Sequence, residues 1–593
     1  MAAIRGSIRA IMMMLVLVSV AHAESAADSA FESIAAAFVD DLPDISPVTA
    51  TILGDHRQDG ALDQVGSDGR AAVIRIYEKH RAALRGIDRQ SLSRANQVDA
   101  DLLRNELESR LWRIETLQEW AWNPLVYVRI SGNSIYGLMA RDFAPMPERL
   151  KNATARLEQL ARFFSQARAS LQPQRVPKIH VETAIQQNSG LNSIIENMIA
   201  PQLDSTSGEF KFRLQAAIAT AKSAISEYQA WLENELLPRA AGDFRIGAVL
   251  FDTKLKFTLN SPLSRREIRT RAENEYVAVR DQMYQISREL YAAEYPFTSF
   301  PDDPDEAYKQ VVIRTALEKA YAQLPERDGI VALARENLQQ ATAFVQERDL
   351  VTVPDEPLQI IVMPEFRRGV TLAYLDQAGP LNTGQESFYA VAPLPSDWTD
   401  DQVSSFLRQY NLLSVQNLTI HEAMPGHYLQ LALGNRYPSV LRSVLWSGPF
   451  VEGWAVYAER MMVDAGYLNN DPLMRLIMLK WYLRAVTNAI IDQAIHVDGM
   501  TRDAAMKLMV EGGFQEEREA AGKWVRAQLT ATQLSTYFVG YQEHRDMRAD
   551  VESAWGDEFT LRRYHDQALS YGSPSIKYVH ALMLDEAIPQ NTQ

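Results

Sequence analysis

Apolar residues recur every three or four positions along most of the chain, with charged residues between them. This spacing puts the apolar side chains on one face of a helix, whereas a strand alternates at every second residue. It predicts a mainly α protein, with long helical segments at residues 71–119, 148–170, 210–235 and 264–293. Clusters of proline and glycine separate these segments, as at residues 296–304.

Two short stretches depart from helical spacing and predict strands. Residues 358–363 and 387–392 are rich in β-branched and aromatic residues, and a proline follows each of them. We expect a small antiparallel β-sheet beside the helix that carries a histidine-containing segment at 421–430. An extended substrate would lie along the second strand near Tyr389 and bind partly through backbone hydrogen bonds. The alternative is that both stretches are irregular connectors.

The organisation predicted for residues 24–593 is one large helical domain, either a single body or two lobes around a cleft. Neither an internal repeat nor a low-complexity linker divides these residues. Hydrophobic residues make up 47% of the chain and charged residues 23%, a balance typical of globular proteins with a large core.

The first 23 residues have the pattern of a cleavable secretory signal peptide. Arg5 and Arg9 precede the apolar residues 10–20, and Ala21-His22-Ala23 is a small-residue cleavage pattern. The apolar run is too short to span a bilayer core of about 30 Å, which argues against a membrane anchor. We therefore expect a periplasmic or secreted protein cut after Ala23.

Charge and cysteine content narrow the classes of function. The formal net charge is −15 without a basic run, so nucleic acid, which needs clustered lysine and arginine, is a poor candidate partner. The sequence has no cysteine, which excludes a disulfide, a thiol nucleophile, a thiolate metal site and a lipid-modified cysteine within these residues. No stretch after the signal peptide is apolar enough to predict a membrane span.

Residues 421–430, His-Glu-Ala-Met-Pro-Gly-His-Tyr-Leu-Gln, carry the chemistry that the sequence suggests. A catalytic zinc takes neutral imidazoles and a carboxylate, and the common helical arrangement spaces two histidines four residues apart. Here His421 and His427 are six apart, which on a regular helix separates them by about 120°. Pro425 should break the helix because its ring clashes with the carbonyl four residues back, and Gly426 permits the detour. The two imidazoles could then meet at one metal ion.

A third ligand must come from elsewhere, and Glu452 is the best candidate. Glu452 and Glu459 are seven residues apart in a predicted helix and therefore share a face. We expect Glu452 to bind the metal and Glu459 to orient a histidine from behind. The alternative for both is an ordinary solvated charge on a helix surface.

The motif H-E-A-x-P-G-H-x-x-Q followed by E-G-W-A resembles the bacterial domain-of-unknown-function family 885 (DUF885), which itself resembles gluzincin-type zinc metallopeptidases. The resemblance extends over nearly all of the mature chain. Its weaker elements are residues 47–56, Arg484, Asp492, His496, Thr536, Tyr537, Gly540, His565 and Asp566. The chain departs from the family pattern R-Y-x-x-x-P-G-Q, where it keeps Arg526 and Gln533 but has Ala527, Ala531 and Thr532 in place of the tyrosine, proline and glycine. The resemblance implies a helical cleft with a small sheet.

Together these residues predict a zinc-dependent peptidase that acts on a peptide or small amide substrate. Zn²⁺ held by His421, His427 and Glu452 would activate a water, and Glu422 would be the general base. The donor to the oxyanion is expected among Tyr537, His496 and His565, in that order. For each of these three, the alternative is packing or an ordinary polar pair, such as Asp492 with His496 four residues later.

Two other functions fit the same residues. A zinc amidohydrolase that cuts a non-peptide or isopeptide amide could use the same ligands, and only substrate profiling would separate it from a peptidase. A non-enzymatic exported binding protein with a degenerate site is less consistent with Glu422, because a structural zinc needs no free general base.

Overall fold

A central helix, α22 (Pro472–His496), organises the larger part of the molecule in the computed structural model, which describes residues 26–363, 372–382, 384–395 and 398–590. Most side chains of α22 are buried, so this helix is enclosed on all sides rather than along one stripe. It belongs to the largest hydrophobic cluster, drawn from residues 251–583, while a second cluster unites residues 48–240. The predicted signal peptide, residues 1–23, lies outside the described residues.

The described chain is mainly α-helical, as the apolar spacing predicts. The α-helices longer than four residues that precede the sheet are α1 (Ala26–Asp40), α3 (Pro47–Leu53), α4 (Ser67–Arg85), α5 (Arg94–Trp112), α7 (Leu125–Met139), α8 (Met146–Ser170), α9 (Lys178–Ile194), α10 (Gly208–Trp231), α12 (Gly247–Leu259), α13 (Arg265–Glu294), α14 (Glu306–Tyr321) and α15 (Ile330–Glu347). Those that follow the sheet are α16 (Asp400–Gln409), α17 (Leu412–Glu422), α18 (His427–Gly434), α19 (Val440–Val444), α20 (Gly448–Asp464), α22, α23 (Arg502–Lys507), α24 (Glu517–Leu529), α25 (Ser535–Trp555), α26 (Leu561–Ser570) and α27 (Ile576–Met583). Among the described residues, no helix is both long and apolar enough to cross a bilayer.

The helices α8, α10 and α13 confirm three of the four predicted helical segments. The fourth, residues 71–119, is divided between α4 and α5 because polar capping residues interrupt the apolar spacing. Gly86 follows the last turn of α4, and the Ser93 hydroxyl accepts a hydrogen bond from the backbone N–H of Asn96 at 3.3 Å, which starts α5.

The expected small sheet is present and has three strands: β1 (Leu358–Val362), β2 (Ala373–Asp376) and β3 (Ser387–Val391). The spatial order is β1-β3-β2, with β1 parallel and β2 antiparallel to β3, so the sheet is mixed rather than antiparallel throughout. After β1 the chain forms β2, which runs in the opposite direction, and then β3, which lies between the two and runs parallel to β1. The expectation that substrate pairs with β3 is wrong, because β3 is the central strand and Tyr389 is fully buried.

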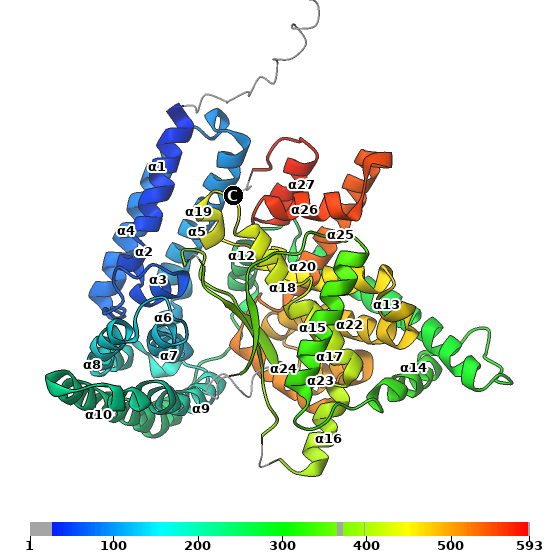
Figure 1. The fold of residues 1–593 in the computed structure, drawn as a ribbon, viewed down its shortest axis with the longest axis horizontal. Helices are drawn as coiled ribbons and strands as arrows, with labels where there is room; N and C mark the ends of the chain where they lie inside the picture. The colour runs from blue at the N-terminus through cyan, green and yellow to red at the C-terminus, as the bar shows by residue number, and fades with distance from the viewer. Residues whose placement is uncertain (1–25, 364–371, 383, 396–397, 591–593) are drawn as a thin grey trace, which may run out of the picture.

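The N-terminal helices contact the sheet at its β2 side. In Figure 1 the strands run between the blue-to-cyan N-terminal helices and the C-terminal helices. Tyr136 donates a hydrogen bond to the Asp376 carboxylate at 2.6 Å, and Arg141 pairs with the same group at 2.7 Å. His56, at the end of the motif at residues 47–56, lies 3.0 Å from the Asn382 side-chain oxygen. The motif therefore supports the segment after β2.

Candidate metal centre

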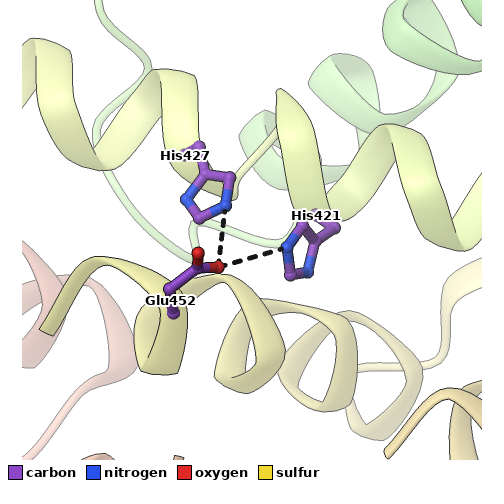
Figure 2. Close-up of side chains that lie close together, drawn as sticks. All are labelled: His421, His427 and Glu452. Atoms are coloured by element: carbon purple, nitrogen blue, oxygen red, sulfur yellow. Dashed lines mark ion pairs between the residues drawn. The ribbon is translucent and has the colours of Figure 1, made fainter. Parts of the chain in front are cut away.

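Three side chains from three helices converge at one point: His421 from the last turn of α17, His427 from the start of α18, and Glu452 from α20 (Figure 2). The Nε2 atom of His427 lies 3.5 Å from Oε2 of Glu452, and Nε2 of His421 lies 3.9 Å from the same oxygen. The two imidazole planes are nearly perpendicular, at 83°. One potential ligand atom from each residue lies within 4.8 Å of the others, so the expected cluster is assembled.

The helix break at Pro425 makes the six-residue spacing workable, as the sequence predicts. α17 ends at Glu422 and α18 begins at His427, with a cis peptide bond between Met424 and Pro425. A Cβ atom on Gly426 would lie 1.9 Å from the carbonyl oxygen of His421. Gly426 is therefore needed for close backbone approach, and its φ of −75° is not one that requires glycine.

Trp454 fixes this break from the opposite helix. Its indole N–H donates a 2.8 Å hydrogen bond to the carbonyl oxygen of Pro425, and its side chain is fully buried. Trp454 is two residues after Glu452, so one turn of α20 both presents the carboxylate and holds the segment between the histidines. The E-G-W-A motif thus has a structural role as well as the proposed ligand.

Glu459 contacts His421 from behind, as expected from its spacing. Its Oε1 accepts a 2.7 Å hydrogen bond from Nδ1 of His421, and its Oε2 accepts one from the Asn417 amide, also at 2.7 Å. The first bond leaves Nε2 of His421 as the nitrogen facing Glu452. A carboxylate in this position fixes the tautomer and the ring orientation of a metal-binding histidine.

The charges around the cluster favour a cation. Burial disfavours protonation of His421, yet Glu459, Glu422 and Glu452 together raise its pKa to about 9. Burial alone would raise the pKa of Glu452, but His427 and His421 lower it below its ordinary value. Three carboxylates around two imidazoles therefore leave an excess of negative charge.

Glu422 lies beside the cluster without belonging to it. One of its carboxylate oxygens accepts a 3.0 Å hydrogen bond from the backbone N–H of Leu375 in β2. Burial raises the pKa of Glu422, while the nearby His427 and His421 oppose that shift. A buried carboxylate whose affinity for a proton is increased suits a general base.

Tyr537 is the one proposed oxyanion donor that the structure brings to the cluster. It lies in the first turn of α25, and burial together with the charge of Glu452 raises its pKa. Arg526 donates a 3.0 Å hydrogen bond to its hydroxyl oxygen. The Tyr537 hydroxyl also forms a hydrogen bond with the Gln533 side chain, so a substrate oxygen would compete with Gln533 for this hydroxyl.

His496 and His565 are not brought to the cluster. Nε2 of His496 lies 2.8 Å from two backbone carbonyl oxygens, those of Ala527 and Thr530. Nδ1 of His565 donates to the Leu350 carbonyl at 2.7 Å, and its Nε2 accepts from a tyrosine hydroxyl at 2.8 Å. These bonds make both residues supports of the surrounding chain rather than donors to a substrate.

Among the described residues, Asp492 forms no hydrogen bond or ion pair with His496. It accepts three hydrogen bonds from Thr532 and from Ser535, the first residue of α25. Its oxygens lie 2.9 Å from the Thr532 N–H, 3.0 Å from the Ser535 N–H and 2.7 Å from the Ser535 hydroxyl. Thr532, which stands where the resembled pattern has glycine, has a φ of +70°, where glycine is favoured. Asp492 therefore holds the turn before Tyr537, in which this chain departs from the family pattern.

The donor set fits a divalent metal such as zinc. Donor atoms about 2.0–2.2 Å from a tetrahedral zinc lie about 3.3–3.6 Å apart. The 3.5 and 3.9 Å separations are close to this range, and two imidazoles with one carboxylate leave a fourth position for water or substrate. Glu459 satisfies the outer nitrogen of His421, as metal-binding histidines require.

Sequence reasoning missed the backbone N–H of Leu375 and the role of Trp454. Residues 373–376, Ala-Tyr-Leu-Asp, are too short and too mixed to predict a strand. Trp454 belongs to the E-G-W-A motif, two residues after Glu452, and this short spacing is the one signal in the sequence that could have predicted a role for it at the site.

Fold and site define a mainly helical protein with a half-buried cluster of two histidines and one glutamate, and with Glu422 directly after the first histidine. The chain belongs to the family DUF885, described as bacterial proteins of unknown function, whose model matches residues 47–583. No protein of curated function matches the chain significantly.

Two solved structures are similar over almost the whole chain. One, described as a putative lipoprotein of unknown function from Shewanella oneidensis, is 33% identical, with a TM-score of 0.79; the match covers 93% of this chain and 99% of that one. The other, described as a putative lipoprotein from Colwellia psychrerythraea, is 18% identical, with a TM-score of 0.76, over 94% of this chain and 99% of that one. The second similarity concerns the fold alone.

Proposed function

We propose that this protein is an exported zinc-dependent peptidase. The observation that carries the proposal is that His421, His427 and Glu452 lie close together. Glu422 lies beside them but outside this group of three, and its carboxylate accepts a hydrogen bond from the backbone N–H of Leu375. A purely structural metal site would fill its fourth position with protein and would not need a separate carboxylate.

The chemistry is the hydrolysis of an amide by water. When bound, the zinc ion supplies Lewis acidity that brings the pKa of a water to about 7. Glu422 removes a proton as the water oxygen bonds to the substrate carbonyl carbon, and it passes that proton to the leaving nitrogen when the C–N bond breaks. The products are a carboxylic acid and an amine.

Tyr537 donates its hydroxyl proton in a hydrogen bond to the carbonyl oxygen on which negative charge develops. Arg526 holds the Tyr537 oxygen at 3.0 Å and so orients the hydroxyl. The proposed substrate of this reaction is a peptide. The Leu375 N–H donates to Glu422, so β2 lies next to the proposed general base.

An exported location is supported by two independent features. Residues 1–23 have the pattern of a signal peptide, and the similar structure that is 33% identical is described as a putative lipoprotein. The present sequence has no cysteine for lipid attachment, so we propose a periplasmic or secreted protein.

The test is metal analysis of the purified protein combined with variants that separate ligand from base. His421→Ala, His427→Ala and Glu452→Ala should each lose bound zinc and peptidase activity. Glu422→Gln should keep the zinc and the fold but lose nearly all turnover. Full activity in Glu422→Gln would refute the mechanism, and zinc retained in all three ligand variants would refute the site.

A further inference from the structure

A cavity of about 330 Å³ lies between α13, α20, α22 and α25, and none of the residues that line it belongs to the candidate metal centre. On α20 it is lined by Tyr457 and Met461, which follow Glu452 by five and nine residues. These intervals place them about 140° and 180° around the helix from Glu452. The cavity and the metal cluster therefore lie on different sides of α20.

The inner wall of the cavity is aromatic and apolar. The rings of Tyr482 and Tyr541 contact each other with their centroids 4.5 Å apart, and Met461 and Val279 continue the same wall. All four side chains are buried. Sites for small molecules have volumes from about 300 Å³ upwards and walls of this kind, so the cavity suits a small ligand with an apolar part.

Tyr457 is held in the wall by His565, a residue that has no place at the metal centre. Burial lowers the pKa of His565 to about 3, so its ring is neutral. Its Nδ1 donates to the Leu350 carbonyl at 2.7 Å, and its Nε2 therefore accepts from the Tyr457 hydroxyl at 2.8 Å. The Tyr457 oxygen keeps its capacity to accept a hydrogen bond on the side of the cavity.

The charged side chains around the cavity balance one another. Three arginines and three acids line it: Arg460, Arg545, Arg548, Glu275, Asp464 and Glu552. Arg460 pairs with Asp464 at 2.8 Å. Arg545 pairs with Glu275 at 2.7 Å. Two of the three possible pairs are thus closed by short contacts within the protein.

The third pair, Arg548 with Glu552, is open. Nε of Arg548 lies 3.8 Å from Oε2 of Glu552, which is too far for a hydrogen bond. Among the described residues, the one hydrogen bond of the Arg548 guanidinium goes to the Tyr457 hydroxyl, at a long 3.5 Å. The two side chains are 30% and 54% exposed, so a ligand that enters from solvent can reach both.

These charges select the kind of ligand. Because the lining has no net charge, it favours neither a simple anion nor a simple cation, but a molecule that carries both charges. The open groups are only 3.8 Å apart, so the two charges of that molecule must also lie close together. An α-amino acid carries its ammonium and carboxylate groups on one carbon atom, and a guanidinium suits a carboxylate because it can donate two parallel hydrogen bonds.

We propose that this cavity binds a free α-amino acid with a large apolar side chain. Arg548 donates hydrogen bonds to the carboxylate, Glu552 accepts from the ammonium group, and the side chain packs against Tyr541 and Met461. This site goes beyond the proposed peptidase function and does not depend on it, because the two sites share no residue.

The experiment is a calorimetric titration of the purified protein with L-leucine, L-leucinamide and N-acetyl-L-leucine. The amide lacks the carboxylate and the acetylated form lacks the ammonium group. Each should bind at least about 10-fold more weakly than leucine, the loss expected when a hydrogen bond to a charged group is removed. Glycine has no side chain for the apolar wall and should also bind at least about 10-fold more weakly. Absence of leucine binding, or equal binding of a blocked form, overturns the proposal.

Variants assign each charge of the ligand to one side chain. Arg548→Gln should bind leucine and leucinamide alike, whereas Glu552→Gln should bind leucine and N-acetyl-leucine alike. Damage to the fold would weaken all ligands together and would not give this crossed pattern. Discrimination at the wild-type level in both variants overturns the proposal.

The matched control is the pair Arg269 and Glu273 in α13. It has the same four-residue spacing and the same side-chain exposures, 30% and 54%, but does not line the cavity. Arg269→Gln and Glu273→Gln should therefore bind leucine as tightly as wild type does. Equal weakening in these control variants would mean that the binding reflects general surface charge, which overturns the proposal.

A competition measurement separates the cavity from the metal centre, where an amino acid could bind a zinc ion. Leucine should bind with unchanged affinity in the presence of saturating acetohydroxamate, a small ligand of zinc. Binding that acetohydroxamate abolishes overturns the proposal. Tighter binding of leucyl-leucine than of leucine also overturns it, because the two charges of a dipeptide lie on different residues.

Discussion

Gly453 and Gly540 contact each other where α20 crosses α25, and neither position can accept a side chain. A Cβ atom on Gly453 would lie 2.2 Å from the carbonyl carbon of Gly540, and one on Gly540 would lie 1.9 Å from the carbonyl oxygen of Pro449. Glu452 directly precedes Gly453, and Tyr537 lies one turn before Gly540. The contact therefore sets how close the carboxylate and the hydroxyl come to each other.

Gly453→Ala should separate α20 from α25 and damage the metal centre. The obstructing atoms are backbone, which cannot rotate away, so we expect a loss of at least about 1–3 kcal/mol of unfolding free energy together with weaker metal binding. Thermal unfolding and a zinc titration measure the two effects.

Gly522→Ala is the matched control, because that glycine lies in α24 with open space around it. It should stabilise by about 0.5–1 kcal/mol, as alanine replaces glycine in a helix. Wild-type stability and metal affinity in Gly453→Ala would show that the helices can separate without consequence.

The sequence was sufficient to predict that His421, His427 and Glu452 lie together, because most of its signals are local. The spacing of His421 and His427, the break at Pro425 and the seven-residue interval from Glu452 to Glu459 all follow from helix geometry. Each needs knowledge of only one short segment. The same local reasoning predicted the helices α8, α10 and α13.

What the sequence could not predict depends on contacts between distant segments. Lys523 looks like an ordinary surface lysine in α24, yet it is only 8% exposed in the folded chain. His565 has the residue type of a catalytic donor, but both ring nitrogens are occupied by groups from elsewhere in the chain. The parallel pairing of β1 with β3 likewise depends on where the chain crosses, which strand composition does not encode.

Glu459→Gln should weaken zinc binding without unfolding the protein. Glutamine can still accept the hydrogen bond from His421, but it lacks the charge that stabilises the correct tautomer and increases the basicity of the ring. We expect an affinity about 10- to 100-fold lower, measured by competition with a chelating dye. Glu347→Gln, an exposed position at the end of α15, is the control and should bind zinc normally. Unchanged affinity in Glu459→Gln would reduce its contact with His421 to packing.

Trp454→Phe should loosen the break between the two histidines. Phenylalanine fills most of the indole volume but cannot donate to the Pro425 carbonyl, which then stays buried without that hydrogen bond. The expected loss is about 1–3 kcal/mol in unfolding free energy, with a fall in zinc affinity because His427 follows the break by two residues. Chemical denaturation and a zinc titration test both parts. Trp446→Phe, at a residue that is 53% exposed, should leave both quantities unchanged. A loss of stability without a loss of affinity would mean that Trp454 supports the fold but not the metal centre.

Tyr537→Phe tests whether the hydroxyl held by Arg526 acts in the transition state. A donor to the developing oxyanion contributes little to substrate binding in the ground state, so its removal should lower kcat much more than it changes KM. We expect kcat to fall by about 100-fold or more, as for other single donors to an oxyanion. Zinc content should stay at the wild-type level, because Tyr537 is not among the residues of the metal cluster. The fold should survive as well, since phenylalanine keeps the ring in place and Arg526 retains its 2.8 Å bond to Gln533. Steady-state kinetics on a peptide that the wild type cleaves, with zinc content measured on the same preparations, separates the possibilities. A raised KM with normal kcat would make Tyr537 a substrate-binding residue, and an unchanged kcat/KM would exclude it from the reaction.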